Sequence, residues 1–123
     1  MQATLLGNVQ NSEIQKFYSK NNVDIFINFS NSEGIPVSIM EALSYGIPVV
    51  ATDVGGTSEI VTSSVGALIH SNANTEELSR VIENVIRRFS TNDAQKIHDI
   101  WKNKYSALTN YNTFIRSLER QYV

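Results

Sequence analysis

The feature that most constrains this fold is an alternation of apolar, β-branched runs with short segments that carry helix signals. Residues 23–29 and 48–52 are nearly continuous apolar runs, and a segment of helical length between Pro36 and Gly46 separates them. Proline is tolerated at the first position of a helix, and glycine is favoured just beyond its end. Strands that are apolar throughout are typical of parallel sheets covered on both faces. The alternation therefore predicts an α/β fold.

Two further segments complete the expected sheet. Residues 65–69 predict a weaker strand, and residues 4–6 a brief one ended by glycine, which gives a parallel sheet of about four strands flanked by helices. Right-handed crossovers would join these strands, as in part of a Rossmann-like fold. With 123 residues and 41% apolar side chains, the chain (residues 1–123) is expected to form a single domain.

Helix starts are marked by polar side chains that can cap the first turn. Apolar residues at helical spacing across residues 78–89 form the firmest helical signal, and a helical tail is expected beyond residue 90. The three start signals pair Ser12 with Gln15, Asn74 with Glu77, and Asn92 with Gln95.

Composition excludes several classes of function. A net charge of −2 with mixed signs argues against a nucleic-acid-binding face. The chain has no cysteine, and its two histidines, His70 and His98, are far apart, so we expect no metal site and ordinary surface or half-buried histidines. The amino-terminal residues do not resemble a signal peptide, and no apolar run is long enough to span a bilayer. We expect a cytoplasmic protein, with peripheral membrane association left open for a full-length context.

The candidate chemistry lies where the expected strands end. In an open parallel sheet, ligands bind at the carboxyl ends of the strands, which would gather residues 7–9, 30–34 and 53–57. Free backbone N–H groups at the start of the helix after Pro36 suit a phosphate or pyrophosphate. Glu33 and Glu41 would repel an anion directly, so we expect them to accept hydrogen bonds from neutral hydroxyl groups of the same ligand.

Two other interpretations of Glu33 and Glu41 stay open at this point. They could be the acid and base of a glycosidase, although a helix start favours the ionised carboxylate and such an acid needs a raised pKa. They could also simply complement the helix dipole or face water.

The run from Glu33 to Gly56 reads EGIPVSIMEALSYGIPVVATDVGG. It resembles the donor-binding segment of GT-B, family 4 type retaining glycosyltransferases, which have two glutamates spaced by seven residues, then Gly-x-Pro-Val and a Gly-Gly turn. Residues 6–9, 22–27 and 65–69 are similar to flanking parts of the same family. The resemblance covers the later part of the C-terminal donor-binding domain.

This resemblance implies a role for each matching residue. Glu33 would be the catalytic-site residue that contacts the transferred hexose, with Gly34 beside it, and Glu41 would hold the ribose hydroxyls. Val9 would lie against the nucleotide base. The pyrophosphate would be held by backbone groups of Gly34, Ile35, Val37 and Ser38. The donor would be a nucleotide-diphosphate sugar, and no metal or other cofactor is expected.

The chain also departs from the family pattern. It lacks the N-terminal acceptor domain of a complete enzyme and the Arg and Lys that neutralise the leaving diphosphate, so we expect no transfer by this chain alone. The family's strand order would leave residues 4–6 without their neighbours, and we expect this segment to relocate beside residues 25–27, to fray, or to be paired in a homodimer through the exposed sheet edge. The alternative function is a non-enzymatic interaction or packing module.

Overall fold

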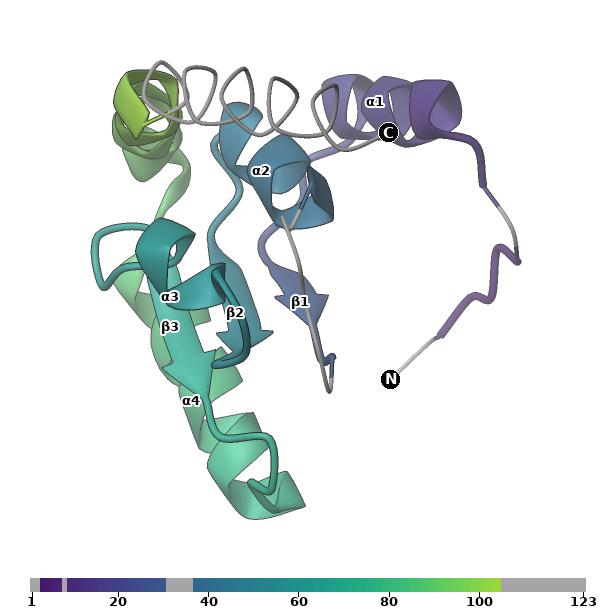
Figure 1. Ribbon diagram of the computed structural model, residues 1–123. Coiled ribbons are helices and arrows are strands. Elements are labelled where there is room, and N and C mark those ends of the chain that lie inside the picture. Colours follow the sequence, from purple (N-terminus) through teal and green to yellow (C-terminus); the bar gives the residue numbers. More distant parts are fainter. Residues whose placement is uncertain (1–2, 8, 31–36, 105–123) are drawn as a thin grey trace, which may run out of the picture.

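The computed structural model describes residues 3–7, 9–30 and 37–104, and helices and parallel strands alternate along them (Figure 1). The helix at residues 94–104 follows the last short turn. The elements before it are α1 (Asn11–Lys20), β1 (Phe26–Asn28), α2 (Val37–Ser44), β2 (Val49–Thr52), α3 (Thr57–Ile60), β3 (Gly66–Ile69), α4 (Thr75–Arg88) and the 3-10 turn η1 (Thr91–Asp93).

The sheet has the order β1-β2-β3, and both pairs of strands are parallel. All four residues of the central strand β2 are buried, in keeping with its apolar sequence. Phe26 is in register with Val49, and Val49 with Gly66. A side chain at Gly66 would collide with the backbone of Val49, so this position requires glycine for the strands to approach. The predicted α/β fold is confirmed.

The predicted strand at residues 4–6 is wrong. The described segment 3–7 forms no strand, and the side chains of Leu5 and Leu6 are 97% and 67% exposed. Figure 1 shows the segment before α1 running apart from β1, so it has not relocated to that edge. A strand of three residues needs a neighbour for its backbone hydrogen bonds, and within the described chain this segment has none. The described sheet therefore has three strands.

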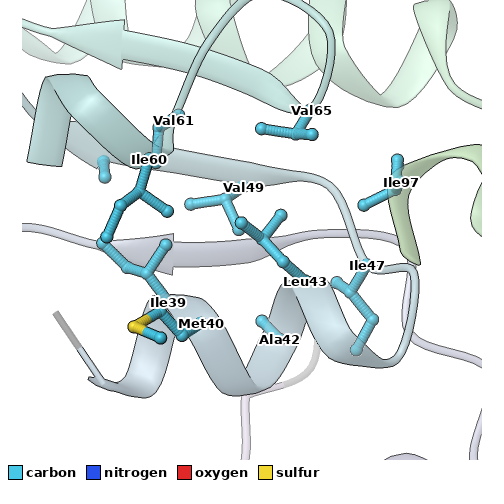
Figure 2. Packing of buried hydrophobic residues seen from close by; sticks show 11 residues of the cluster. Ile39, Met40, Ala42, Leu43, Ile47, Val49, Ile60, Val61, Val65 and Ile97 are labelled. Atoms are coloured by element: carbon cyan, nitrogen blue, oxygen red, sulfur yellow. The ribbon is translucent and has the colours of Figure 1, made fainter. Parts of the chain in front are cut away.

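Helices cover both faces of this sheet. Val49 and Ala51 belong to the larger core cluster with α2, α3 and Ile97, whereas Val50 packs with Val85 of α4. Because neighbouring side chains of a strand point to opposite faces, α2 and α4 lie on opposite sides of β2. Figure 2 shows the larger cluster, in which the buried side chains of α2 face β2 and the chain around α3.

Two helix boundaries follow the prediction. The Asn74 side chain accepts a hydrogen bond from the backbone N–H of Glu77 at 2.9 Å, which confirms the start of α4. Gly46 ends α2 with a φ of +74°, and its N–H donates to the Leu43 carbonyl at 2.9 Å. The N–H of Ile47 donates to the Ala42 carbonyl at 3.1 Å, which completes a Schellman motif.

Two other start signals were wrong. The residue before α1 is Gln10, so Ser12 lies inside the helix and does not cap it. The later helix is preceded by a capping box between Ser90 and Asp93, not one at Asn92, and Asp93 accepts from the Ser90 N–H at 2.8 Å. The helical tail is confirmed to residue 104, and its expected part beyond that lies outside the described residues.

Candidate functional site

The carboxyl ends of all three strands border one cavity. Because the strands are parallel, the residues that follow them meet at the same edge of the sheet. The cavity has a volume of about 230 Å³, smaller than the pockets of about 300–1,000 Å³ that enclose drug-sized ligands. Its size suits one part of a larger ligand. It is lined by Phe29, Ser30, Thr52, Ile69, His70, Ser71, Ala73 and Leu78.

A buried hydroxyl group fixes the polar wall of this cavity. Thr52, at the end of β2, is 4% exposed, and its Oγ1 accepts a hydrogen bond from the backbone N–H of Ser30 at 3.0 Å. The same oxygen donates to the carbonyl of Asn28 at 3.4 Å, and the Ser30 hydroxyl donates to Asn28 Oδ1 at 3.0 Å. These bonds attach the chain leaving β1 to β2. They therefore hold Ser30 beside the end of β2.

Thr52 and Asn28 were not among the predicted site residues. Both stand at the carboxyl ends of strongly apolar strands, and a polar residue at that place was the one signal in the sequence that could have identified them. The Thr52 hydroxyl forms hydrogen bonds with Ser30 and Asn28, which precede it by 22 and 24 positions in the chain. Local sequence patterns do not reveal bonds over such separations.

The first turn of α2 is open to solvent. Val37 is 54% exposed and Ser38 is also exposed, whereas Ile39 and Met40 are buried against the core. This helix thus directs one face into the protein and leaves the residues of its first turn exposed. A helix start of this kind carries partial positive charge and free N–H donors, which favour an anion.

The site residues predicted in and just before α2 fall into two groups. Glu33, Gly34 and Ile35 lie outside the described residues, so their placement stays a prediction. Val37 and Ser38 occupy the exposed first turn of α2, and Glu41 is half-buried one turn further along.

Val9 is half-buried in the segment before α1. In Figure 1 this segment runs apart from β1, so the described chain does not gather residues 7–9 at the strand ends with residues 29–30 and 52–53. The contact of Val9 with a base stays a prediction.

Glu41 faces α1. Burial, and after it the negative charge of Glu41, raises the pKa of the Tyr18 phenol in α1. The charge of Glu41 is therefore close enough to act on that hydroxyl group, and the Glu41 side chain is half-buried.

The Gly-Gly turn supplies backbone geometry near the end of β2. Gly55 has a φ of +53°, in the left-handed region that favours glycine. Gly56 precedes α3, and Thr57 is the first helical residue and is buried. Glu59 is exposed in the first turn of α3, where its charge complements the helix dipole.

The two histidines have separate surroundings. His70 is exposed on the cavity wall, and His98 is half-buried with its Nδ1 2.7 Å from the Ser44 carbonyl oxygen. Among the described residues no group of three or more acidic or histidine side chains could hold a metal ion. Within the same residues, no helix has the length and apolar character needed to cross a membrane.

The arrangement suits a hydroxyl-bearing ligand with an anionic group. Serine, threonine and histidine offer hydrogen-bonding groups on the cavity wall, and the start of α2 offers backbone donors. The described residues that line the cavity include no lysine or arginine. Any anion here would therefore be held by backbone dipoles unless another segment supplies a cation.

Comparison with known proteins gives one family. A family model described as "Glycosyl transferases group 1" matches residues 1–103. The chain is 38% identical over 65 residues to the O-antigen biosynthesis glycosyltransferase WbnH of Escherichia coli, covering 53% of this chain and 18% of the relative.

Two longer alignments agree. The Vi polysaccharide biosynthesis protein VipC/TviE of Salmonella typhi is 28% identical over 104 residues, which cover 80% of this chain and 18% of the relative. A phosphatidylinositol N-acetylglucosaminyltransferase protein of Arabidopsis thaliana is 29% identical over 102 residues, or 83% of this chain and 22% of the relative. The chain thus spans about a fifth of the length of these relatives.

Proposed function

The chain belongs to the group 1 family of glycosyl transferases, and from this premise we propose that it is the donor-binding portion of a retaining GT-B enzyme of family 4 type. The donor is a nucleotide-diphosphate sugar, and the transferred group is a hexose. The observation that carries this proposal is the position of α2. Its exposed first turn, with Val37 and Ser38, begins one turn before the half-buried carboxylate of Glu41.

Each part of the donor matches a different group. The pyrophosphate accepts hydrogen bonds from backbone N–H groups of Gly34, Ile35, Val37 and Ser38, where the helix dipole favours negative charge. The ribose hydroxyls donate to Glu41, because an ionised carboxylate can only accept.

The hexose and the base of the donor have separate partners in this proposal. Glu33 receives the hydroxyls of the transferred hexose, with Gly34 beside it, and is the candidate catalytic residue. The base lies against Val9. The cavity of about 230 Å³ at the strand ends offers room for one ring of such a ligand, not for the whole donor.

The chain binds the donor without transferring the sugar. Departure of a diphosphate needs positive charge or strong donors at the leaving group, and the described lining of the cavity has neither lysine nor arginine. An acceptor domain and those cations would come from the rest of a complete enzyme, of which this chain covers about a fifth by comparison with its relatives. No metal takes part in this proposal.

Titration calorimetry with UDP, GDP and ADP tests the proposal. We expect one of the three to bind the wild-type chain, and Glu41→Ala to weaken that binding about 10-fold to 100-fold, because a hydrogen bond to a charged group contributes about 1.5–3 kcal/mol. Glu83→Ala is the matched control, since Glu83 is exposed on α4 across the sheet.

Two results would contradict the proposal. If the wild-type chain binds none of the three nucleotides, the alternative of a non-enzymatic packing module is favoured. Hydrolysis of aryl glycosides that disappears in Glu33→Ala would instead favour a glycosidase.

A further inference from the structure

A second cavity lies at the amino end of the sheet, opposite the candidate site at the strand ends. Its lining includes Val23 and Asp24, which come shortly before β1, and Ile47 and Pro48, which come just before β2. In Figure 1 the arrowheads of β1 and β2 mark the other, carboxyl end of the sheet. The cavity has a volume of about 150 Å³, close to the liquid volume of about five water molecules. It is therefore large enough for a compact organic group.

Helices α1, α2 and α4 all end at this cavity. Asn21 follows α1, Tyr45 and Gly46 follow α2, and Phe89 follows α4, and all four residues line the cavity. The carboxyl end of a helix carries partial negative charge, because its last carbonyl groups have no partner within the helix. The helix ends therefore place the cavity in a region of negative potential, which favours a cation.

The charged groups around the cavity favour a cation as well. Asp24 is exposed, and it is the only charged side chain among the described residues that line the cavity. Lys20 and Arg88 stand in the last turns of α1 and α4, but neither belongs to the described lining. The Arg88 guanidinium instead donates to the carbonyl groups of Ser63 and Gly66, at 3.4 and 2.9 Å. The negative charge of Asp24 is therefore not offset by a basic side chain within the described lining.

Tyrosine rings supply an aromatic wall. Tyr18 of α1 and Tyr45, after α2, both line the cavity, with ring centroids 5.5 Å apart and an angle of 53° between the ring planes. Tyr18 is half-buried against the larger core cluster, so its ring is held in place. A cation within about 6 Å of the centroid of an aromatic ring is attracted to the face of that ring. Aromatic rings beside a carboxylate are suited to an organic ammonium group.

We propose that this cavity binds a compact organic ammonium cation, held by the Asp24 carboxylate, the rings of Tyr18 and Tyr45 and the carboxyl ends of α1, α2 and α4. This site is separate from the proposed donor site, and it does not rest on nucleotide binding. The two ends of α2 then favour ligands of opposite charge, because the helix dipole is positive at the start of the helix and negative at its end.

A nuclear magnetic resonance titration with choline chloride tests this proposal. The matched probe is the uncharged analogue of choline in which a carbon atom replaces the nitrogen, and sodium chloride keeps the ionic strength constant. We expect saturable shifts of the backbone amide signals of Asn21, Asp24 and Gly46 with choline and none with the analogue, because only the cation is attracted to the carboxylate and the ring faces.

Three variants locate the bound cation. Asp24→Asn keeps the size of the side chain and removes its charge, so the dissociation constant for choline should rise about 3-fold to 5-fold, as for the loss of an exposed ion pair. Tyr45→Leu keeps an apolar side chain without the ring and should raise the constant about 2-fold to 5-fold. Glu76→Gln is the matched control, since it neutralises an exposed carboxylate in the first turn of α4, at the far end of that helix. It should bind choline like wild type.

Thermal unfolding followed by circular dichroism shows whether each variant is folded. If Tyr45→Leu is not folded, the exposed position of Asp24 still lets Asp24→Asn decide the question. The proposal is overturned if choline causes no saturable shifts, or if the uncharged analogue binds equally well, which would make this an apolar cavity. Equal affinities of Asp24→Asn and wild type would also overturn it, as would an equal loss in Glu76→Gln, which would indicate attraction to the overall charge of the chain.

Discussion

His98 Nδ1 lies 2.7 Å from the carbonyl oxygen of Ser44, the last residue of α2. The imidazole also packs on Trp101, with ring centroids 5.5 Å apart. Because the last carbonyls of a helix have no partner within the helix, a donor from another helix stabilises them. This bond joins the helix at residues 94–104 to the end of α2.

Replacing His98 should loosen that junction. We expect His98→Ala to lower the free energy of unfolding by about 1–2 kcal/mol, because it removes one hydrogen bond and part of the packing on Trp101. Urea denaturation followed by circular dichroism measures the change. His70→Ala, an exposed histidine on the cavity wall, should stay within about 0.5 kcal/mol of wild type, and an equal loss in both variants would count against the junction.

Gly46 lies against Ala94 at the same junction, and we expect its replacement to lower the stability of the fold. Its φ is +74°, and a Cβ there would collide with the backbone of Ala94. We expect Gly46→Ala to destabilise the chain by about 3 kcal/mol, since backbone strain and a steric clash act together. Gly7 is the matched control, because it has a φ of +70° but nothing within 4 Å of the added Cβ. Gly7→Ala should cost no more than about 1 kcal/mol, and similar losses would rule out the contact with Ala94 as the cause.

The Thr52 hydroxyl should matter for both stability and the site. Thr52→Val keeps the shape of the side chain but leaves the Ser30 N–H without its acceptor, so we expect a loss of about 1–2 kcal/mol in thermal or urea unfolding. Nucleotide binding should also weaken, because Thr52 and Ser30 both line the cavity at the strand ends. Thr62→Val, in the loop before β3, is the control and should change neither quantity measurably; equal effects would argue against a special role for the bridge.

Sequence reasoning succeeded where a signal is local. The apolar run of β2 predicts burial on both faces, and the Asn74 cap with apolar spacing predicts α4, because propensity, periodicity and capping agree in both segments. Gly46 as the end of α2 was predictable for the same reason.

Sequence reasoning failed where the structure depends on groups that are distant in the chain or that compete for the same role. Leu5 and Leu6 resemble a strand, but a strand exists only through its neighbour. The sequence predicted a helix start at Asn92, but the capping box forms at Ser90, two residues earlier. It forms there because the carboxylate of Asp93 reaches the backbone N–H of Ser90. The bridge from Thr52 to Ser30 spans 22 residues, so no local pattern could reveal it.

Asp93 should give the chain a measurable acid sensitivity. The backbone N–H of Ser90 is the main cause that lowers the pKa of this carboxyl below its usual 3.8. A carboxyl with a lowered folded-state pKa stabilises the fold above its unfolded-state value, and this contribution is lost as pH falls through the folded-state pKa. Wild type should thus be more stable than Asp93→Asn at neutral pH, with the difference shrinking below about pH 3.8.

Urea denaturation of both proteins across this pH range checks the expectation. Ser90→Ala should also be more stable than Asp93→Asn at neutral pH, and most of the pH dependence of this difference in stability should remain. The variant preserves the backbone donor and removes only the weaker hydroxyl bond at 3.2 Å. A difference between wild type and Asp93→Asn that is constant with pH would exclude the charge as its source.

The backbone donors at the start of α2 can be tested by removing a single N–H. Val37 is the first residue of α2, where proline is tolerated, so Val37→Pro should preserve the helix while deleting one of the donors assigned to the pyrophosphate. We expect nucleoside diphosphate affinity to fall about 10-fold or more, since a hydrogen bond to a charged group contributes about 1.5–3 kcal/mol. Affinity for the nucleoside without phosphates should not change. Val37→Ala removes the same exposed side chain but keeps the N–H, so it should bind like wild type; if it loses as much affinity as Val37→Pro, the side chain and not the backbone donor is responsible.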